Sequence, residues 1–342
     1  VLGLAFRAPL LSFIFGKVDA DVMENSMVYF FYTVLSYPFI ALYDAGASIF
    51  RAQENTRGPM VISIISNVMN IVGNGILIWV FHMGVAGAAI STLVSRIFCA
   101  VVVLYQLRKD RQPIVVRDYL KIRTDGKMIG RILALGIPSG IENSMFQLGK
   151  LAIQSTVSTL GTTAIAAQAM TNMLEMLNGT AVIGVGIGLM TVVGQSLGAG
   201  KKDEAVYYMK KLMIFSEVFL IACCAVVYVL ARPITMIGGM EAKSAEMCLD
   251  MMFWITIVKP IVWMFAFIPA YGMRAAGDVK FSMITSCITM WTFRFCLCVY
   301  LIRVCGMGPM AVWIGMFTDW TVRAIVFGLR FKSGKWMEHK VV

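Results

Sequence analysis

The sequence predicts an all-α polytopic membrane protein, because apolar residues are abundant, charged residues are scarce, and the apolar residues gather in long runs. Of the 342 residues, 59% are hydrophobic and 14% are charged, and the mean hydropathy is +0.78. Soluble domains carry about 25% charged residues. Several of the apolar runs reach the roughly 20 residues that a helix needs to cross a bilayer.

Ten apolar runs are candidate membrane-spanning helices. The first is short, and the sixth is too long for a single crossing, so we expect its far end to project from the membrane. In order, the ten runs cover residues 1–16, 27–50, 60–81, 85–107, 128–160, 163–197, 206–230, 245–273, 281–302 and 309–329.

The charges of the connecting segments predict the orientation. When the segments are taken alternately, one set carries a net charge of +12 and the other −2. Positive loops face the cytoplasm in membrane proteins. The positive set includes the segment after residue 107 and the C-terminal tail, so both are expected on the cytoplasmic side.

An internal repeat relates the two parts of the chain. The run that begins at Arg51 (RAQENTRGPM) matches the run that begins at Arg274 (RAAGDVKFSM), and Pro38 matches Pro260, at offsets of 223 and 222 residues. Parallel repeats of this kind are typical of two-lobed transporters. Two complete copies need more residues than the chain has, so we expect an N-terminal truncation that leaves about ten of twelve helices. Pro38 and Pro260, each in the middle of a helix, are hinge candidates.

This repeat predicts the domain organisation. Residues 1–107 form a partial N-terminal lobe with the last four of its six helices. Residues 108–127 form a basic cytoplasmic linker, residues 128–331 a C-terminal lobe of six helices, and residues 332–342 a cytoplasmic tail.

Polar side chains interrupt the two apolar runs at 128–160 and 163–197. Spacings of three and four residues place most of them on one helix face, and charged groups at membrane depth usually face a protein interior or a wet cavity. We therefore expect a polar transport pathway walled by these helices. Its candidate residues are Glu142, Asn143, Gln147, Lys150, Gln154, Gln168, Asn172, Glu175 and, in a later span, Lys259.

The structural alternatives to this interpretation are ordinary helix packing and ion pairing. Glu142 and Lys150 could pair with other helices, and Gln168, Asn172 and Glu175 could hold neighbouring helices together by hydrogen bonds. Asp319 and Arg323, four residues apart, predict an ion pair within the last helix. Arg294 is expected to be the partner of another helix.

The remaining motifs exclude other classes of function. A net charge of +11 is explained by cytoplasmic loops, so no nucleic-acid partner is expected. The eight cysteines form no Cys-x-x-Cys pair and are expected to pack as small apolar residues. The sequence contains no Walker motif and no constellation of nucleophile and base, so we expect neither a primary pump nor an enzyme. No cofactor and no metal are expected.

Four segments resemble a known family of transporters. GVGIGLMTVVGQSLGAGKKDEA from Gly184 and the turns RAQENTRGPM and RAAGDVKFSM are similar to segments of multidrug and toxic compound extrusion (MATE) transporters. GIPSGIENSMFQLGK from Gly136 is similar to the opening of the second lobe in the bacterial branch of that family. The resemblance implies a two-lobed, MOP flippase-like fold of twelve helices. It implies export of cationic or amphipathic compounds in exchange for H⁺ or Na⁺, by a monomer in the bacterial inner membrane.

The resemblance leaves the coupling residue and two other functions open. The family's coupling carboxylate in the first lobe lies on the first helix, which this chain does not contain. Some sodium-type members have a glutamate on the seventh helix, and Glu142 lies about one turn nearer the start of the corresponding helix. The alternatives are a flippase for a lipid-linked saccharide or peptide, favoured if Arg and Lys dominate the groove, and a truncated fragment that does not transport.

Overall fold

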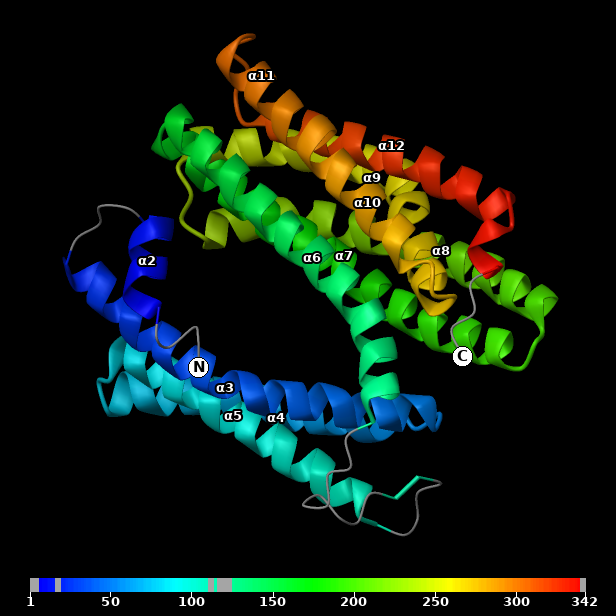
Figure 1. The fold of residues 1–342 in the computed structure, drawn as a ribbon. Coiled ribbons are helices and arrows are strands. Elements are labelled where there is room, and N and C mark those ends of the chain that lie inside the picture. Colours follow the sequence, from blue (N-terminus) through cyan, green and yellow to red (C-terminus); the bar gives the residue numbers. More distant parts are fainter. Residues whose placement is uncertain (1–5, 16–19, 110–113, 116–124, 339–342) are drawn as a thin grey trace. The chain divides into compact units, whose positions relative to one another are not determined.

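The fold was analysed in a computed structural model that describes residues 6–15, 20–109, 114–115 and 125–338 (Figure 1). The parts of the predicted linker and tail at 110–113, 116–124 and 339–342 lie outside the described residues, as do the ends of the first predicted span. Every regular element in the described ranges is helical. The chain divides into two compact units, residues 1–123 and 124–342.

The described residues of the first unit form four helical segments around a small apolar core. α3 and α4 both pack against α5, and the core between them consists of Phe50, Ile62, Cys99, Val103 and Leu107. Arg96 of α5 donates a hydrogen bond to the buried hydroxyl of Ser36 on α3. The helices are α2 (Arg7–Phe15), α3 (Ala20–Ala52), α4 (Arg57–Gly75) with its π-helical continuation η1 (Ile76–Val80), and α5 (Gly84–Leu107).

The second unit, as far as it is described, contains six long helical segments. They are α6 (Gly126–Val157) with the 3₁₀ turn η2 (Ser158–Leu160), α7 (Thr162–Gly198), α8 (Lys202–Ile237), α9 (Ala242–Ala275), the continuous run α10 (Val279–Thr289), η3 (Met290–Cys296) and α11 (Leu297–Arg303), and α12 (Met310–Lys332). A short 3₁₀ turn, η4 (Lys335–Met337), follows α12. Gly161, with φ of +92°, makes the predicted break between α6 and α7.

Two cores organise the second unit. A large one, rich in methionine and tryptophan, joins α7, α8, α9 and α12, and includes Met209, Trp263 and Trp320. A smaller one joins α6 to η3, α11 and α12, and includes Ile153 and Met290. α6 therefore packs chiefly against α10 and η3, whereas α7 packs against α8 and α9. The two helices are consecutive in sequence but belong to different packing groups, and the space between these groups holds the cavity described below.

In the residues that the structure describes, all ten predicted spans contain helix, and eight of the described helices are long and apolar enough to cross a membrane. The described part of α2 has nine residues, fewer than a crossing needs. α6 has 32 residues but is interrupted by polar and charged side chains. A helix that lines a polar cavity can carry such residues because that face avoids lipid.

The helix bounds repeat as the sequence predicts. α3 and α9 begin at Ala20 and Ala242 and end at Ala52 and Ala275, which gives offsets of 222 and 223 residues. The turns repeat as well. Glu54 (φ +61°) corresponds to Gly277 (φ +85°), 223 residues later.

Candidate functional site

A cavity of about 380 Å³ lies within the second unit, and it is the site that the polar side chains form. Its wall comes from α6, α7, α9, α10, η3 and α12. Its charged lining consists of four cations, Lys150, Arg274, Arg294 and Arg323, and two carboxylates, Glu142 and Glu175. The lining side chains therefore carry a formal charge of +2.

One face of α6 supplies four lining residues: Glu142, Asn143, Phe146 and Lys150. At about 100° per residue these four fall within an arc of about 100°. Gln147 and Gln154 lie about 20–40° beyond that arc, are exposed, and do not line the cavity. The predicted stripe is thus rotated, with Phe146 and Lys150 near its centre.

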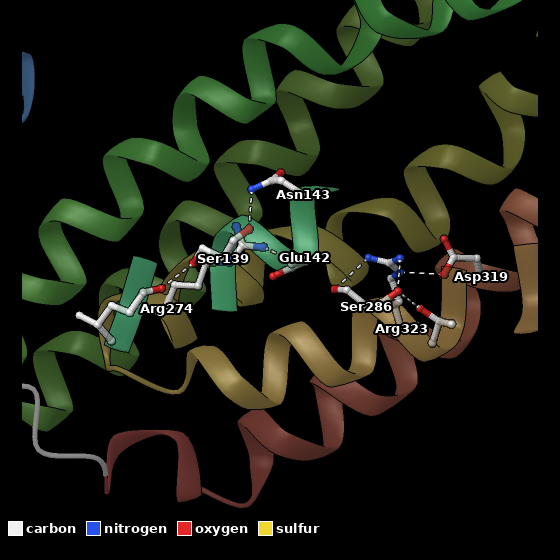
Figure 2. Close-up of polar contacts among 9 residues, drawn as sticks. Ser139, Glu142, Asn143, Arg274, Ser286, Asp319 and Arg323 are labelled. Carbon is white, nitrogen blue, oxygen red and sulfur yellow. Dashed lines mark hydrogen bonds and ion pairs between the residues drawn. The ribbon is translucent and has the colours of Figure 1, made fainter. Parts of the chain in front are cut away.

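Glu142 forms an ion pair with Arg274 at the cavity wall (Figure 2). Nη2 of Arg274, in the last turn of α9, lies 2.7 Å from Oε1 of Glu142. The other carboxylate oxygen, Oε2, is buried and has no hydrogen-bond partner among the described residues. Asn143 beside it donates a hydrogen bond to the backbone oxygen of Ser139. Glu142 therefore presents one oxygen to a protein cation and keeps one free.

Glu175 of α7 pairs with Lys259 of α9. Nζ of Lys259 lies 2.6 Å from Oε1 and 3.1 Å from the backbone oxygen of Glu175, and its side chain is fully buried. Lys259 does not line the cavity itself. It pairs with Glu175, which does line the cavity.

Arg323 of α12 is held in place by three hydrogen bonds (Figure 2). Its Nε lies 2.7 Å from Oδ1 of Asp319, which confirms the predicted pair within the last helix. Nη1 and Nη2 donate to the hydroxyl and the backbone oxygen of Ser286 on α10. This guanidinium is therefore neutralised and fixed.

Arg294 and Lys150 have no carboxylate partner among the described residues. Arg294 is 6% exposed, and its Nε has no hydrogen-bond partner. Its guanidinium carbon lies 5.2 Å from the ring centre of Phe146, and Nζ of Lys150 lies 4.9 Å from the same centre. Arg294 thus touches another helix, as expected, but through an aromatic ring and not through an ion pair.

Gln168 and Asn172 serve packing. Nε1 of Trp313 on α12 donates to Oε1 of the buried Gln168 (3.1 Å), and Nε2 of Gln168 donates to Oδ1 of Asn172 (3.2 Å). Neither residue lines the cavity. They hold α7 against α12 by hydrogen bonds, which is the alternative to a place in the transport pathway.

Aromatic rings form the apolar part of the wall. They include Trp263, Phe267 and Tyr271 of α9 and Trp320 of α12, and the rings of Trp263 and Phe267 are stacked at 4.9 Å. Neither these rings nor Arg274 were among the residues predicted from the sequence. Arg274 lies just after an apolar run, and this position gives no sign of a partner 132 residues away.

The hinge candidates Pro38 and Pro260 lie inside α3 and α9, which continue through them as helices. α9 also contains Pro269, one of its buried residues. The structure thus places these prolines within long helices, and hinge motion at Pro38 and Pro260 stays a prediction.

Two family models match the chain. MatE matches residues 138–300, which include most of the cavity lining, and Lipid II flippase MurJ matches residues 2–124. Among curated relatives, Probable multidrug resistance protein NorM of Thermotoga maritima is 25% identical over 96% of this chain and 71% of its own length. Uncharacterized transporter YisQ of Bacillus subtilis is 26% identical, over 97% of this chain and 73% of its own length.

Solved structures share the fold. An outward-facing multidrug resistance MATE family transporter of the MOP superfamily aligns with a TM-score of 0.86 at 18% identity, over 97% of this chain and 75% of its own. A MOP superfamily transporter from Pyrococcus furiosus, whose reverse polarity of binding pocket suggests a different function, aligns with a TM-score of 0.88 at 17% identity. That alignment covers 98% of this chain and 76% of the Pyrococcus furiosus chain. The MatE match over residues 138–300, the multidrug resistance relatives and this fold together support a MATE family efflux transporter.

Proposed function

We propose that the protein is a secondary active antiporter that exports cationic or amphipathic compounds in exchange for H⁺ or Na⁺ by rocking of its two lobes. The observation that carries the proposal is the charged cavity of the second unit. Ionisable groups are costly at membrane depth and mark ion or substrate pathways. A volume of about 380 Å³ falls in the range of pockets that hold drug-sized ligands.

Glu142 is the proposed exchange group. Its free, buried Oε2 is an acceptor that a proton or Na⁺ would satisfy. Binding of either at Glu142 would weaken the pair with Arg274 and change the charge of the cavity wall. Glu175 is a second candidate. Lys259 donates hydrogen bonds to its carboxylate Oε1 and to its backbone oxygen, and these contacts favour a fixed structural charge.

The proposed orientation follows from the loop charges. The segments that carry +12 would face the cytoplasm, together with the C-terminus, in the inner membrane of a bacterium. Substrate would then enter from the cytoplasm or the inner leaflet. We propose a monomer as the transporting unit.

Dye transport into inverted membrane vesicles tests the proposal and the coupling ion. With the full chain in the membrane, a proton gradient without Na⁺, or a Na⁺ gradient with a protonophore, should drive accumulation of the fluorescent cation dansylcadaverine. Vesicles that lack the protein are the control. Equal dye levels in both preparations under either gradient would contradict antiport and would favour the non-transporting alternative.

A flippase for a lipid-linked saccharide or peptide is the second candidate. Two observations favour it: the match of the first unit to the MurJ model and the excess of cations in the cavity lining. Its cargo is anionic, as a basic cavity requires.

A further inference from the structure

We propose that the cavity of the second unit contains an oxyanion subsite, formed by Arg294 with Lys150, for the carboxylate, sulfonate or phosphate of an amphipathic aromatic ligand. The inference names a substrate class and rests on the proposed function, in which this cavity receives the transported compound. It goes beyond that function because it assigns the unneutralised charge of the cavity to a particular ligand group.

The charge balance of the cavity is the first reason. Glu142, Glu175 and Asp319 are each bonded to one cation, namely Arg274, Lys259 and Arg323. These three pairs leave Arg294 and Lys150 uncompensated. A cationic ligand would meet carboxylates that are already paired with protein cations, whereas an anionic ligand would find two unpaired cations.

The burial of Arg294 is the second reason. A buried charge is costly unless it is paired and hydrogen-bonded, and Arg294 is 6% exposed with an unpartnered Nε. Three cations also crowd around Phe146, because Arg294, Lys150 and Arg323 lie 5.2, 4.9 and 5.9 Å from its ring centre. A ligand oxyanion would relieve this repulsion and supply the missing acceptor.

The position of Arg294 is fixed by its backbone. It lies in the π-helical segment η3, a type of segment frequent at functional sites. The absence of a side chain at Gly315 lets α12 approach, since a Cβ there would lie 2.8 Å from the backbone oxygen of Arg294. The guanidinium is thus presented from a rigid support, which lowers the entropy lost when it binds a ligand.

The aromatic wall identifies the remainder of the ligand. Trp263, Phe267 and Trp320 line the same cavity, and stacked or edge-on rings favour an aromatic body. The ligand class is therefore an aromatic amphiphile that carries one oxyanion group. A soluble compound and an anionic lipid head group share this chemistry.

A structural explanation competes with this proposal. Oδ2 of Asp319 is buried and has no hydrogen-bond partner among the described residues, and the charge of Asp319 acts on Arg294, so in this explanation Asp319 is the acceptor for Arg294. Arg294 would then be a neutralised structural group without preference for anionic ligands. The test must therefore measure selectivity for the oxyanion, not only affinity.

Binding of matched dansyl probes to the full chain in phosphatidylcholine nanodiscs provides that test. Dansylglycine carries a carboxylate, and its methyl ester lacks only that charge. Energy transfer from tryptophan to dansyl reports binding, with Trp263 and Trp320 in the cavity wall. One charge-assisted hydrogen bond corresponds to a preference of about tenfold for dansylglycine over the ester. Arg294→Met should remove this preference and leave the ester affinity unchanged, and Arg294→Lys should keep part of it.

Further variants and lipids separate the possible outcomes. Arg303→Gln, which removes an exposed charge at the end of α11, should leave both affinities unchanged, whereas Lys150→Met should weaken dansylglycine alone. Phosphatidylglycerol that competes with dansylglycine in the wild type but not in Arg294→Met would identify a lipid head group as the occupant; no competition would identify a soluble compound.

Three results would overturn the inference. Equal affinity of the wild type for acid and ester, or an Arg294→Met variant that keeps the preference, would refute the oxyanion subsite while the proposed antiport stands. A wild-type chain that binds neither probe would also refute the subsite, and transport of the cationic dansylcadaverine would then decide separately whether the proposed antiport stands.

Discussion

Glu142 offers one oxygen to Arg274 and keeps the other free, so a single substitution can separate ion exchange from folding. Glu142→Gln preserves an acceptor for Arg274 but binds neither a proton nor Na⁺ with a charge change. We expect gradient-driven dye accumulation to fall to the level of vesicles that lack the protein. Thermal unfolding of the purified variant should stay close to that of the wild type.

Glu217 provides the matched control for this residue. It lies on α8, outside the cavity lining, and its carboxylate also has a buried oxygen without a partner among the described residues. Glu217→Gln should transport at the wild-type rate. Full transport by Glu142→Gln would refute the assigned role, and loss in both variants would show that the effect is not specific to the cavity.

Single residues also show where reasoning from the sequence ends. The sequence identifies Glu142, Lys150 and Glu175 as cavity residues because a charge inside an apolar run is conspicuous. It misses Arg274 because the residue lies at a helix end, where a charge is common, and its partner is 132 residues away. It also assigns Gln168 to the pathway, although the amide contacts Trp313, since one helix face alone does not reveal which helix covers it.

At the scale of helices and turns, the repeat predicts where the backbone of the first unit is strained. Glu54 and His82 have φ of +61° and +52°, whereas glycines occupy the corresponding positions of the second unit, Gly277 and Gly306. The left-handed conformation costs a non-glycine residue about 1–2 kcal/mol. In the second unit the same turns thus contain glycine, which adopts positive φ without this cost.

Glu54→Gly and His82→Gly should therefore stabilise the protein. Both side chains are exposed, so little packing is lost, and we expect a gain of about 1 kcal/mol each after the greater flexibility of glycine in the unfolded chain is included. Thermal unfolding of the full chain in detergent measures this gain. Glu54→Ala, which keeps a Cβ in the strained conformation, should give no increase, and a higher melting temperature for Ala than for Gly would contradict the explanation.

The helices themselves were largely predictable, and the charge of the site was not. Apolar run lengths place α5 and α7 within one residue at each end, because helix ends coincide with the polar turns that hydropathy detects. The neutralisation of each charge depends on which helices meet across the unit. α6 and α7 follow each other in sequence but pack into different groups, so the balance of +2 in the lining emerges only from the tertiary structure.

At the scale of the whole molecule, two family models divide the chain between them. MurJ matches 2–124 and MatE matches 138–300, and each corresponds to one compact unit. An exporter releases its cargo to water, whereas a flippase leaves the lipid part of its cargo in the membrane. The cavity of about 380 Å³ suits one drug-sized molecule, and its aromatic wall offers stacking surfaces more than the many polar partners that a saccharide needs.

Reconstituted vesicles can distinguish these two functions directly. The probe is a fluorescent sugar attached to a polyprenyl diphosphate. Dithionite, which does not cross the membrane, bleaches only the probe molecules in the outer leaflet. We expect the bleached fraction to stay constant under a proton or Na⁺ gradient. The same vesicles should move dansylcadaverine under one of these gradients. The opposite result is a bleached fraction that changes with the gradient in the wild type but not in Arg294→Met. It would show that the basic cavity carries a lipid-linked diphosphate, because the loss would then depend on the charge that recognises the oxyanion of a membrane-bound cargo.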